Sequence, residues 1–462
     1  MHAAIRLPQR IPNLNLTIYE KNPEIGGTWY ENRYPGVACD VPAHSYTLIY
    51  EPNPEWSEFY ASGQEILRYL QRVADKYDIR KYMKFNHKCL GGTWNEEKGK
   101  WKVEIEGPDG KKLSDECDVL ITATGILNNW KWPDIPGLDS FKGTRVHSAV
   151  WPEDLDLSGQ NVAVIGNGSS AIQIIPRLQK IVNRLDAYAR GTTWISPPLA
   201  GSKVEEHNPG GGNSNSPPKN ITNIVTFEEE QIRKWKQDKA AFDQFRREIE
   251  YEQHLSYKAL LQGTEDQKAG EAFFTDMMKK KLEKKPEIFE QLLPSFPPGC
   301  RRLTPGPGYL EALVQPNVDF IKTKIKQIHP DGIETEDGKI RKVDVIVCAT
   351  GFDVSGQKYI PLTGRNGVKI NDKWAKQPVA YNSFAVDEFP NCFITAGPNI
   401  TLSNGNLILM FEKVVEYAAK SIKKMQREGI KVMVVKKEAV DDWKEYCDNF
   451  FPRTVFATKV FR

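Results

Sequence analysis

The chain has 462 residues, enough for two or three domains of about 100–200 residues each. Hydrophobic residues make up 40% and charged residues 27% of the sequence, an ordinary globular mixture that excludes an intrinsically disordered chain. The 63 basic and 60 acidic residues leave a net charge of only +3, which argues against a nucleic-acid partner. No apolar run reaches the roughly 18 residues that a transmembrane segment needs.

The cysteines exclude two further classes of protein. Seven cysteines are scattered along the chain, and no two of them have a CxxC spacing. This pattern disfavours both a disulfide framework and a zinc site, so we expect no metal site. Because the sequence also shows no secretory signal, we expect a reducing, cytoplasmic location.

The first predicted elements are the end of a helix and a strand. Residues 1–7 are expected to be helical, and Pro8 and Pro12 should close that helix. Residues 14–19 alternate and end on Glu20, as a strand does in a dinucleotide-binding unit. The glycine-rich turn of such a unit should lie about 20 residues earlier, but no glycine precedes Glu20. Either the chain is an incomplete version of a longer protein, or this nucleotide site is crippled.

Further strands alternate with helices along the chain. An amphipathic helix is expected at residues 170–180, and buried strands are expected at residues 118–123, 161–165, 185–189 and 343–348. This alternation indicates parallel sheets covered by helices on both faces.

Two segments between the strands have a different composition. Residues 201–219 are rich in Gly, Ser, Asn and Pro, and they predict a loop or linker. Residues 226–293 have a strongly helical, charged pattern. We interpret them as a helical insertion that forms a solvated cap.

The clearest motif is a GxGxxA turn between a strand and a helix. Gly166, Gly168 and Ala171 hold its fixed positions, and Ser169 starts the helix. The first glycine permits a tight turn, the second lets the backbone approach a pyrophosphate, and the alanine lets the helix pack closely. The N–H groups at the start of the helix then face the phosphates. Arg190, at the end of the next strand, suits a 2′-phosphate and hence NADPH; a plain surface arginine is the alternative.

A second motif points to a family. Phe141, Gly143, His147, Trp151 and Pro152 match the pattern FxGxxxHxxxW followed by Pro or Asp, just before the GxGxxA turn. On this fingerprint the chain is identified as a member of the type I Baeyer–Villiger monooxygenases, within the flavin-containing monooxygenase superfamily. Its motifs most resemble those of fungal secondary-metabolism members, and the resemblance covers essentially the whole chain.

The resemblance implies an α/β fold with two Rossmann-like dinucleotide-binding domains. A discontinuous FAD-binding domain is expected at residues 1–150 and 346–462, and an NADPH-binding domain at residues 151–345, with the helical insertion at about 220–295. The first strand–turn–helix unit of the FAD domain is expected to be missing. Members of the family also continue beyond the point where this chain stops, so we expect it to be truncated at both ends.

The resemblance also assigns residues to the cofactor sites. Arg302 is similar to the arginine over the flavin, where a permanent positive charge would stabilise negative charge that develops during the reaction. Asp40 would orient that guanidinium, and Arg301 would join Arg190 at the 2′-phosphate. For each of these charged residues, a structural ion pair, a loop or a surface charge is the alternative. The expected FAD contacts are Glu20, Gly26, Gly27, Thr28, Trp29, Asp40 and Tyr46.

The implied reaction uses FAD and NADPH to insert one oxygen atom of O2 next to a ketone carbonyl, giving an ester or lactone. The expected substrate is a polyketide or terpenoid intermediate of secondary metabolism. In the fingerprint, His147 should couple domain motion to the cofactor, while Phe141 and Trp151 should pack in the core. Two alternatives stay open: a flavin-dependent hydroxylase or heteroatom oxygenase, and an inactive truncated remnant that binds NADPH at most.

Overall fold

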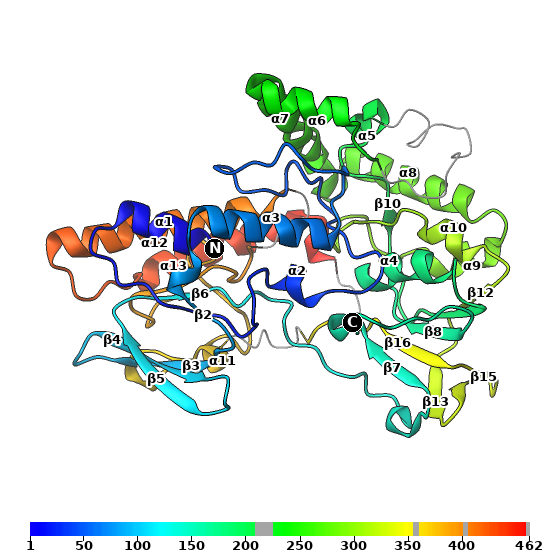
Figure 1. Ribbon diagram of the computed structural model, residues 1–462, viewed down its shortest axis with the longest axis horizontal. Helices are drawn as coiled ribbons and strands as arrows, with labels where there is room; N and C mark the ends of the chain where they lie inside the picture. The colour runs from blue at the N-terminus through cyan, green and yellow to red at the C-terminus, as the bar shows by residue number, and fades with distance from the viewer. Residues whose placement is uncertain (208–224, 354–359, 401–404, 459–462) are drawn as a thin grey trace.

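The chain folds into two sheet-containing halves with a group of helices at one side (Figure 1). The computed structural model describes residues 1–207, 225–353, 360–400 and 405–458. One half combines the N-terminal and C-terminal parts of the chain, and the other is formed by its middle part. The chain therefore leaves the first half, builds the second and returns.

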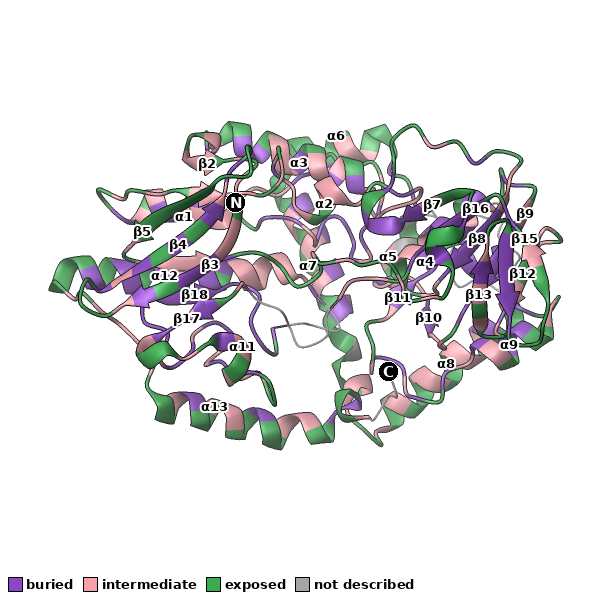
Figure 2. Cartoon of the chain, turned by 90° about the horizontal axis from the view of Figure 1, so that it is seen from below, coloured by how far each residue is buried: buried purple, intermediate pink, exposed green. Residues whose placement is uncertain are grey.

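The second half is built on a five-stranded parallel sheet. Its strand order is β12-β9-β8-β16-β7. The strands are β12 (Val318–Ile321), β9 (Arg184–Tyr188), β8 (Asn161–Ile165), β16 (Val345–Cys348) and β7 (Thr144–His147). The three central strands are almost entirely buried, as Figure 2 shows in purple and as expected for strands that are packed on both faces. The strands expected at 161–165, 185–189 and 343–348 are thereby confirmed.

This sheet includes strands from outside residues 151–345, the segment expected to form the NADPH-binding domain. β7 precedes residue 151, and most of β16 follows residue 345. Both strands nevertheless pair with their neighbours in the sheet, with Cys348 opposite His147 on one side and Ile165 on the other. The division of the chain into an FAD domain and an NADPH domain at these positions stays a prediction.

The first half contains two separate pairs of parallel strands. β1 (Ile18–Tyr19) pairs with β2 (Met83–Lys84), and β6 (Leu120–Thr122) pairs with β18 (Cys392–Ile394). β6 confirms the strand expected at 118–123. The strand expected at 14–19 is confirmed only over its last two residues, because only these pair with β2.

Segments at β1 and β6 pack against the same helices. Leu14, Leu16, Val119 and Ile121 all pack against one cluster formed by the helices α1 (His2–Arg10) and α12 (Leu407–Glu428). No hydrogen bonds join β1 to β6 among the strands that the structure describes. β6 is also less buried than its outer neighbour β18.

Smaller sheets and helices complete both halves, and the antiparallel sheets among them were not predicted. The antiparallel sheet of the first half comprises β3 (Lys88–Asn95), β4 (Lys100–Glu106) and β5 (Lys112–Cys117), with β17 (Leu362–Thr363) parallel to β3. The second half adds β10 (Ile195–Ser196), β11 (Thr304–Pro305), β13 (Ile325–His329), β14 (Gly332–Thr335) and β15 (Ile340–Lys342). Helices outside the insertion also include α2 (Thr28–Glu31), α3 (Gly63–Lys76), α4 (Ser169–Leu178), α10 (Tyr309–Leu313), α11 (Ile370–Lys373) and α13 (Lys437–Phe450).

The helical insertion is anchored by an aromatic cluster. Its helices are α6 (Glu229–Gln237), α7 (Lys239–Leu255), α8 (Glu265–Lys281) and α9 (Pro286–Leu292). The ring of His44, which is fully buried, has four aromatic rings at centroid distances of 4.8–5.7 Å, those of Phe227, Trp235, Phe242 and Phe245. The expected solvated cap is therefore packed onto the first half through a core of its own.

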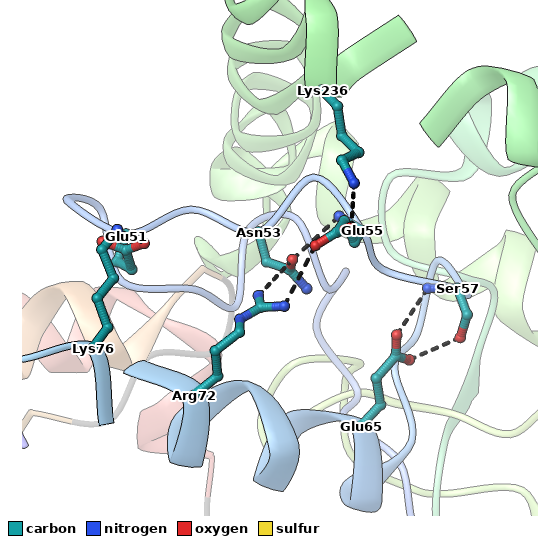
Figure 3. Close-up of polar contacts among 8 residues, drawn as sticks. All are labelled: Glu51, Asn53, Glu55, Ser57, Glu65, Arg72, Lys76 and Lys236. Atoms are coloured by element: carbon teal, nitrogen blue, oxygen red, sulfur yellow. Dashed lines mark hydrogen bonds and ion pairs between the residues drawn. The ribbon is translucent and has the colours of Figure 1, made fainter. Parts of the chain in front are cut away.

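Polar contacts join the cap to α3 beside this cluster (Figure 3). Lys236 of α6 donates to Glu55 at 2.6 Å. Arg72 of α3 donates to the same carboxylate at 3.5 Å and to the side-chain oxygen of Asn53 at 2.8 Å. Exposed pairs of this kind contribute little free energy each, but they fix the direction in which α6 approaches α3.

Two local expectations are wrong. Residues 201–207 form the helix α5 (Gly201–His207) and not a loop, because Lys203 is held by Glu248 of α7 at 2.7 Å. The rest of that expected loop, 208–219, lies outside the described residues. The first helix also continues through Pro8 to Arg10. Proline removes one backbone hydrogen bond there, but the packing of buried α1 residues against α12 holds the helix together.

Within the described ranges, no helix combines the length and apolar character needed to cross a membrane.

The cap cluster generates a stability prediction. Phe245 is 6% exposed and stacks on Trp235 at 4.5 Å, so Phe245→Ala should lower the free energy of unfolding by about 3–5 kcal/mol. Tyr251 lies on the same helix and is 68% exposed, so Tyr251→Ala should change it by no more than about 0.5 kcal/mol. Urea unfolding measures both variants. Equal effects would contradict the packing of α7 on the first half.

Candidate functional site

An ion pair between Asp40 and Arg302 joins the two halves where they meet. Asp40 lies in the loop after α2, and Arg302 lies in the segment before β11. Both carboxylate oxygens of Asp40 accept hydrogen bonds from Arg302, one from Nε and one from Nη2, and the Nη2–Oδ1 distance is 2.8 Å. The two side chains are 33% and 23% exposed for arginine and aspartate. Paired hydrogen bonds of this kind fix both the position and the plane of the guanidinium.

The guanidinium of Arg302 keeps its charge in this setting. Burial acts to lower the pKa of Arg302, but the hydrogen bond to Asp40 and the attraction of its carboxylate outweigh burial and raise the pKa above its ordinary value. Arginine is charged at any working pH in any case. The contact between the halves therefore carries a permanent, oriented positive charge.

The segment expected to contact the flavin combines an open glycine with packed aromatic rings. Gly27 has a φ of +52°, and no atom lies within 4 Å of a Cβ built there. Gly26 has a φ of +123°, which also favours glycine. Thr28 begins α2, and the indole of Trp29 donates to the hydroxyl of Tyr46 at 3.1 Å. Burial raises the pKa of Tyr46, so this hydroxyl stays protonated.

Glu20 lies directly after β1 with acceptor capacity to spare. Among the residues that the structure describes, its carboxylate accepts one hydrogen bond, from the backbone N–H of Asn22 at 2.9 Å. Burial raises the pKa of Glu20. Because a carboxylate offers about four acceptor sites, Glu20 can still accept hydrogen bonds from ribose hydroxyls.

The GxGxxA turn has the geometry that the motif predicts. Gly166 has a φ of +132°, and a Cβ there would lie 2.2 Å from the carbonyl oxygen of Ala349. At Gly168 nothing lies within 4 Å of such an atom. Ser169 begins α4, and Ala171 is fully buried. The first glycine is thus required by packing, whereas the second leaves the backbone open to a ligand.

Two cations flank this turn, and the sequence predicted only one of them. Arg190 follows β9, is exposed, and makes no hydrogen bond or ion pair within the described part of the chain. Lys322 follows β12, and its ammonium donates to the backbone carbonyl of Gly191 at 2.9 Å. Asn167 donates to the same carbonyl at 2.8 Å. Lys322 was missed because only the pairing of β12 with β9 brings it there.

Arg301 lies apart from these contacts. Its guanidinium lies over the ring of Phe296, 5.0 Å from the ring centroid. Its role at the 2′-phosphate stays a prediction.

His147 of the fingerprint links β7 to the segment after β16. Its Nδ1 accepts the backbone N–H of Ala149 at 3.2 Å, and its Nε2 lies 3.3 Å from the hydroxyl of Thr350. The ring also stacks on Trp130 at 4.7 Å. Burial lowers the pKa of His147, so the ring is neutral at pH 7. The contact with Thr350 suits a coupling role better than acid–base chemistry.

Three of the other fingerprint residues serve packing. Phe141 and Trp151 are buried, with 6% and 7% exposure. A Cβ at Gly143 would lie 2.3 Å from the carbonyl oxygen of Asp344, so only glycine fits there. Pro152 is exposed directly after Trp151. No group of His, Cys, Asp or Glu suited to a metal ion occurs in the part of the chain that the structure describes.

Comparison with known proteins shows the family. Residues 13–202 match the model of the flavin-binding monooxygenase-like family. The chain is 39% identical to the FAD-binding monooxygenase tazF of Aspergillus terreus, over 96% of this chain and 76% of that protein. It is 30% identical to a Baeyer–Villiger monooxygenase of Streptomyces coelicolor, over 99% of this chain and 82% of that protein. The chain belongs to the Baeyer–Villiger monooxygenase family.

A solved monooxygenase structure has the same fold. The structure of an oxidised steroid monooxygenase bound to NADP matches this chain with a TM-score of 0.83 and 27% identity, covering 99% of this chain and 90% of that one. The expected α/β architecture with Rossmann-like domains is confirmed. The prediction that the chain is a flavoprotein monooxygenase of the Baeyer–Villiger type is also confirmed by the family model and the relatives.

The two glycines of the turn should respond differently to alanine. In Gly166→Ala, the new Cβ meets the carbonyl of Ala349 in a backbone conformation that strains alanine, so strain alone should lower the free energy of unfolding by about 1–3 kcal/mol. Gly168→Ala adds a methyl group in open space and should change it by no more than about 0.5 kcal/mol. Thermal and urea unfolding measure both. A more stable Gly166→Ala variant would contradict the close approach of the Ala349 segment.

Proposed function

We propose that this chain is an FAD- and NADPH-dependent monooxygenase that inserts one oxygen atom of O2 next to a ketone carbonyl, forming an ester or lactone. The observation that carries this proposal is the guanidinium of Arg302, held by Asp40 where the two halves meet. The name of the FAD-binding relative and the NADP of the steroid monooxygenase structure support the two cofactors.

The residues present fit both cofactors. For NADPH, the open backbone at Gly168 and the start of α4 suit the pyrophosphate, and Arg190, which has no partner among the described residues, suits the 2′-phosphate. For FAD, the spare acceptor capacity of Glu20 suits the ribose, and the open backbone at Gly27 permits close approach. Held by these residues, FAD would supply the activation of O2.

The chain's own residues then act by charge and position. Arg302 stabilises negative charge that develops on oxygen as the carbonyl is attacked. Asp40 holds the guanidinium in one orientation, and its own charge tempers the field of the arginine. His147 is neutral and holds the Thr350 segment in place, so no proton transfer is assigned to it.

We assign the substrate to the polyketide or terpenoid ketones of secondary metabolism. The amino-acid sequences of the chain's motifs support this class, as does its 39% identity to a fungal FAD-binding monooxygenase. We also assign the protein to the cytoplasm, since all seven cysteines are free and a reducing compartment keeps thiols in that state.

Replacing Arg302 should abolish most of the activity. Arg302→Ala removes the positive charge, so the rate of ester formation should fall by about 10²–10³-fold. Arg302→Lys keeps a charge but loses the paired hydrogen bonds to Asp40, so its rate should be intermediate. Product chromatography measures these rates, with Arg427→Ala as the control because that side chain is 70% exposed on α12. Full ester formation by Arg302→Ala would refute the role.

Substrate competition separates the oxidation chemistries. A ketone should accelerate NADPH consumption and yield ester or lactone, whereas an amine or a thioether should yield little oxygenated product. Mass spectrometry of the products measures this preference. Faster formation of an N-oxide or sulfoxide would favour the heteroatom oxygenase, and a chain that cannot retain FAD would favour the inactive remnant.

A further inference from the structure

Lys322 differs from the lysine two residues further along the same segment. Lys324 forms an ion pair with Glu336 at 3.0 Å. Lys322 is half-buried, and its ammonium makes no ion pair with any residue that the structure describes; it donates to the carbonyl of Gly191. Burial lowers the pKa of Lys322. Partly burying an ammonium group beside a neutral partner alone costs free energy. A bound anion would offset this cost.

The fold brings Lys322 to the edge where the nucleotide motif lies. β12 runs parallel to β9, with Ile321 opposite Tyr188, and the N–H of Ala189 donates to the carbonyl of Ile321 at 3.0 Å. Arg190 and Lys322 therefore leave adjacent strands at the same carboxyl edge. This is the edge at which ligands of open α/β sheets bind.

Three adjacent strand ends converge on one carbonyl. The GxGxxA turn follows β8 and sends the amide of Asn167 to the Gly191 carbonyl, while Lys322 reaches the same oxygen from β12. Gly191 directly follows Arg190, which itself has no partner among the described residues. Two cations that form no ion pair within the described part of the chain therefore lie at the carboxyl end of β9.

We propose that Lys322 binds the 2′-phosphate of NADPH together with Arg190, and that this lysine is a determinant of the preference for NADPH over NADH. The proposal rests on the NADPH dependence proposed above. A phosphate monoester carries about −1.5 to −2 charges at pH 7 and accepts several hydrogen bonds, which suits two cations from neighbouring strands. NADH has only a ribose hydroxyl there, so Lys322 stays on the Gly191 carbonyl and contributes no binding.

The test compares two dinucleotides that differ only in the 2′-phosphate. Isothermal titration calorimetry gives the affinities for NADP⁺ and NAD⁺ without any turnover of the enzyme. Lys322→Met should weaken NADP⁺ binding about 10–100-fold and leave NAD⁺ binding unchanged. Lys322→Gln can still donate to the Gly191 carbonyl but lacks the charge, so it should lose NADP⁺ affinity to the same extent. Lys322→Arg should keep most of it, and the matched control Lys324→Met should lose none.

Three outcomes would overturn the proposal. Unchanged NADP⁺ binding in Lys322→Met and Lys322→Gln, with a parent protein that binds NADP⁺, would remove the lysine from the phosphate site and leave the proposed function standing. Equal losses for NADP⁺ and NAD⁺ would show that the lysine only shapes the Gly191 turn. A correctly folded parent protein that binds neither dinucleotide would contradict the NADPH dependence itself. Circular dichroism confirms that each variant is folded before titration.

Discussion

The ion pair between Arg302 and Asp40 is the interaction on which the proposed chemistry depends. It crosses from the segment before β11 to the loop after α2, so the position of the charge depends on how the two halves meet. Near this ion pair, α4 of the second half contacts the first half through hydrogen bonds. The side chain of Gln173 donates to the carbonyl of Ala38 at 3.0 Å and accepts from the hydroxyl of Tyr34 at 2.9 Å. The parallel sheet that presents the GxGxxA turn thereby also supports the loop that holds the arginine.

The helical cap holds the same loop from another side. Arg246 of α7 donates to the backbone carbonyl of His44 at 3.1 Å, and the cap's aromatic rings enclose the ring of that histidine. His44 lies four residues after Asp40. The loop therefore forms hydrogen bonds with α4, with Arg302 and with α7. A movement of any of these three would change how the loop presents Asp40 to the guanidinium.

The sequence predicted those elements whose identifying residues lie close together in the chain. The strand at 161–165, the turn at Gly166 and the start of α4 follow one another in the chain, so their pattern is readable. Features that depend on contacts between distant segments were not readable. α5 is held by Glu248 of α7, His44 is enclosed by rings some 180–200 residues further on, and Lys322 reaches Gly191 only because β12 pairs with β9. The pairing of Arg302 with Asp40, 262 residues apart, was predicted through family resemblance.

A double-mutant cycle between Asp40 and Arg302 tests the central interaction most directly. The rate of ester formation is measured for the parent protein, for Asp40→Asn, for Arg302→Lys and for the combined variant. If the carboxylate acts by orienting the guanidinium, the two single effects should not add, and the coupling energy should exceed about 1 kcal/mol. Additive effects, with a coupling energy near zero, would mean that the two residues act independently and would contradict the account.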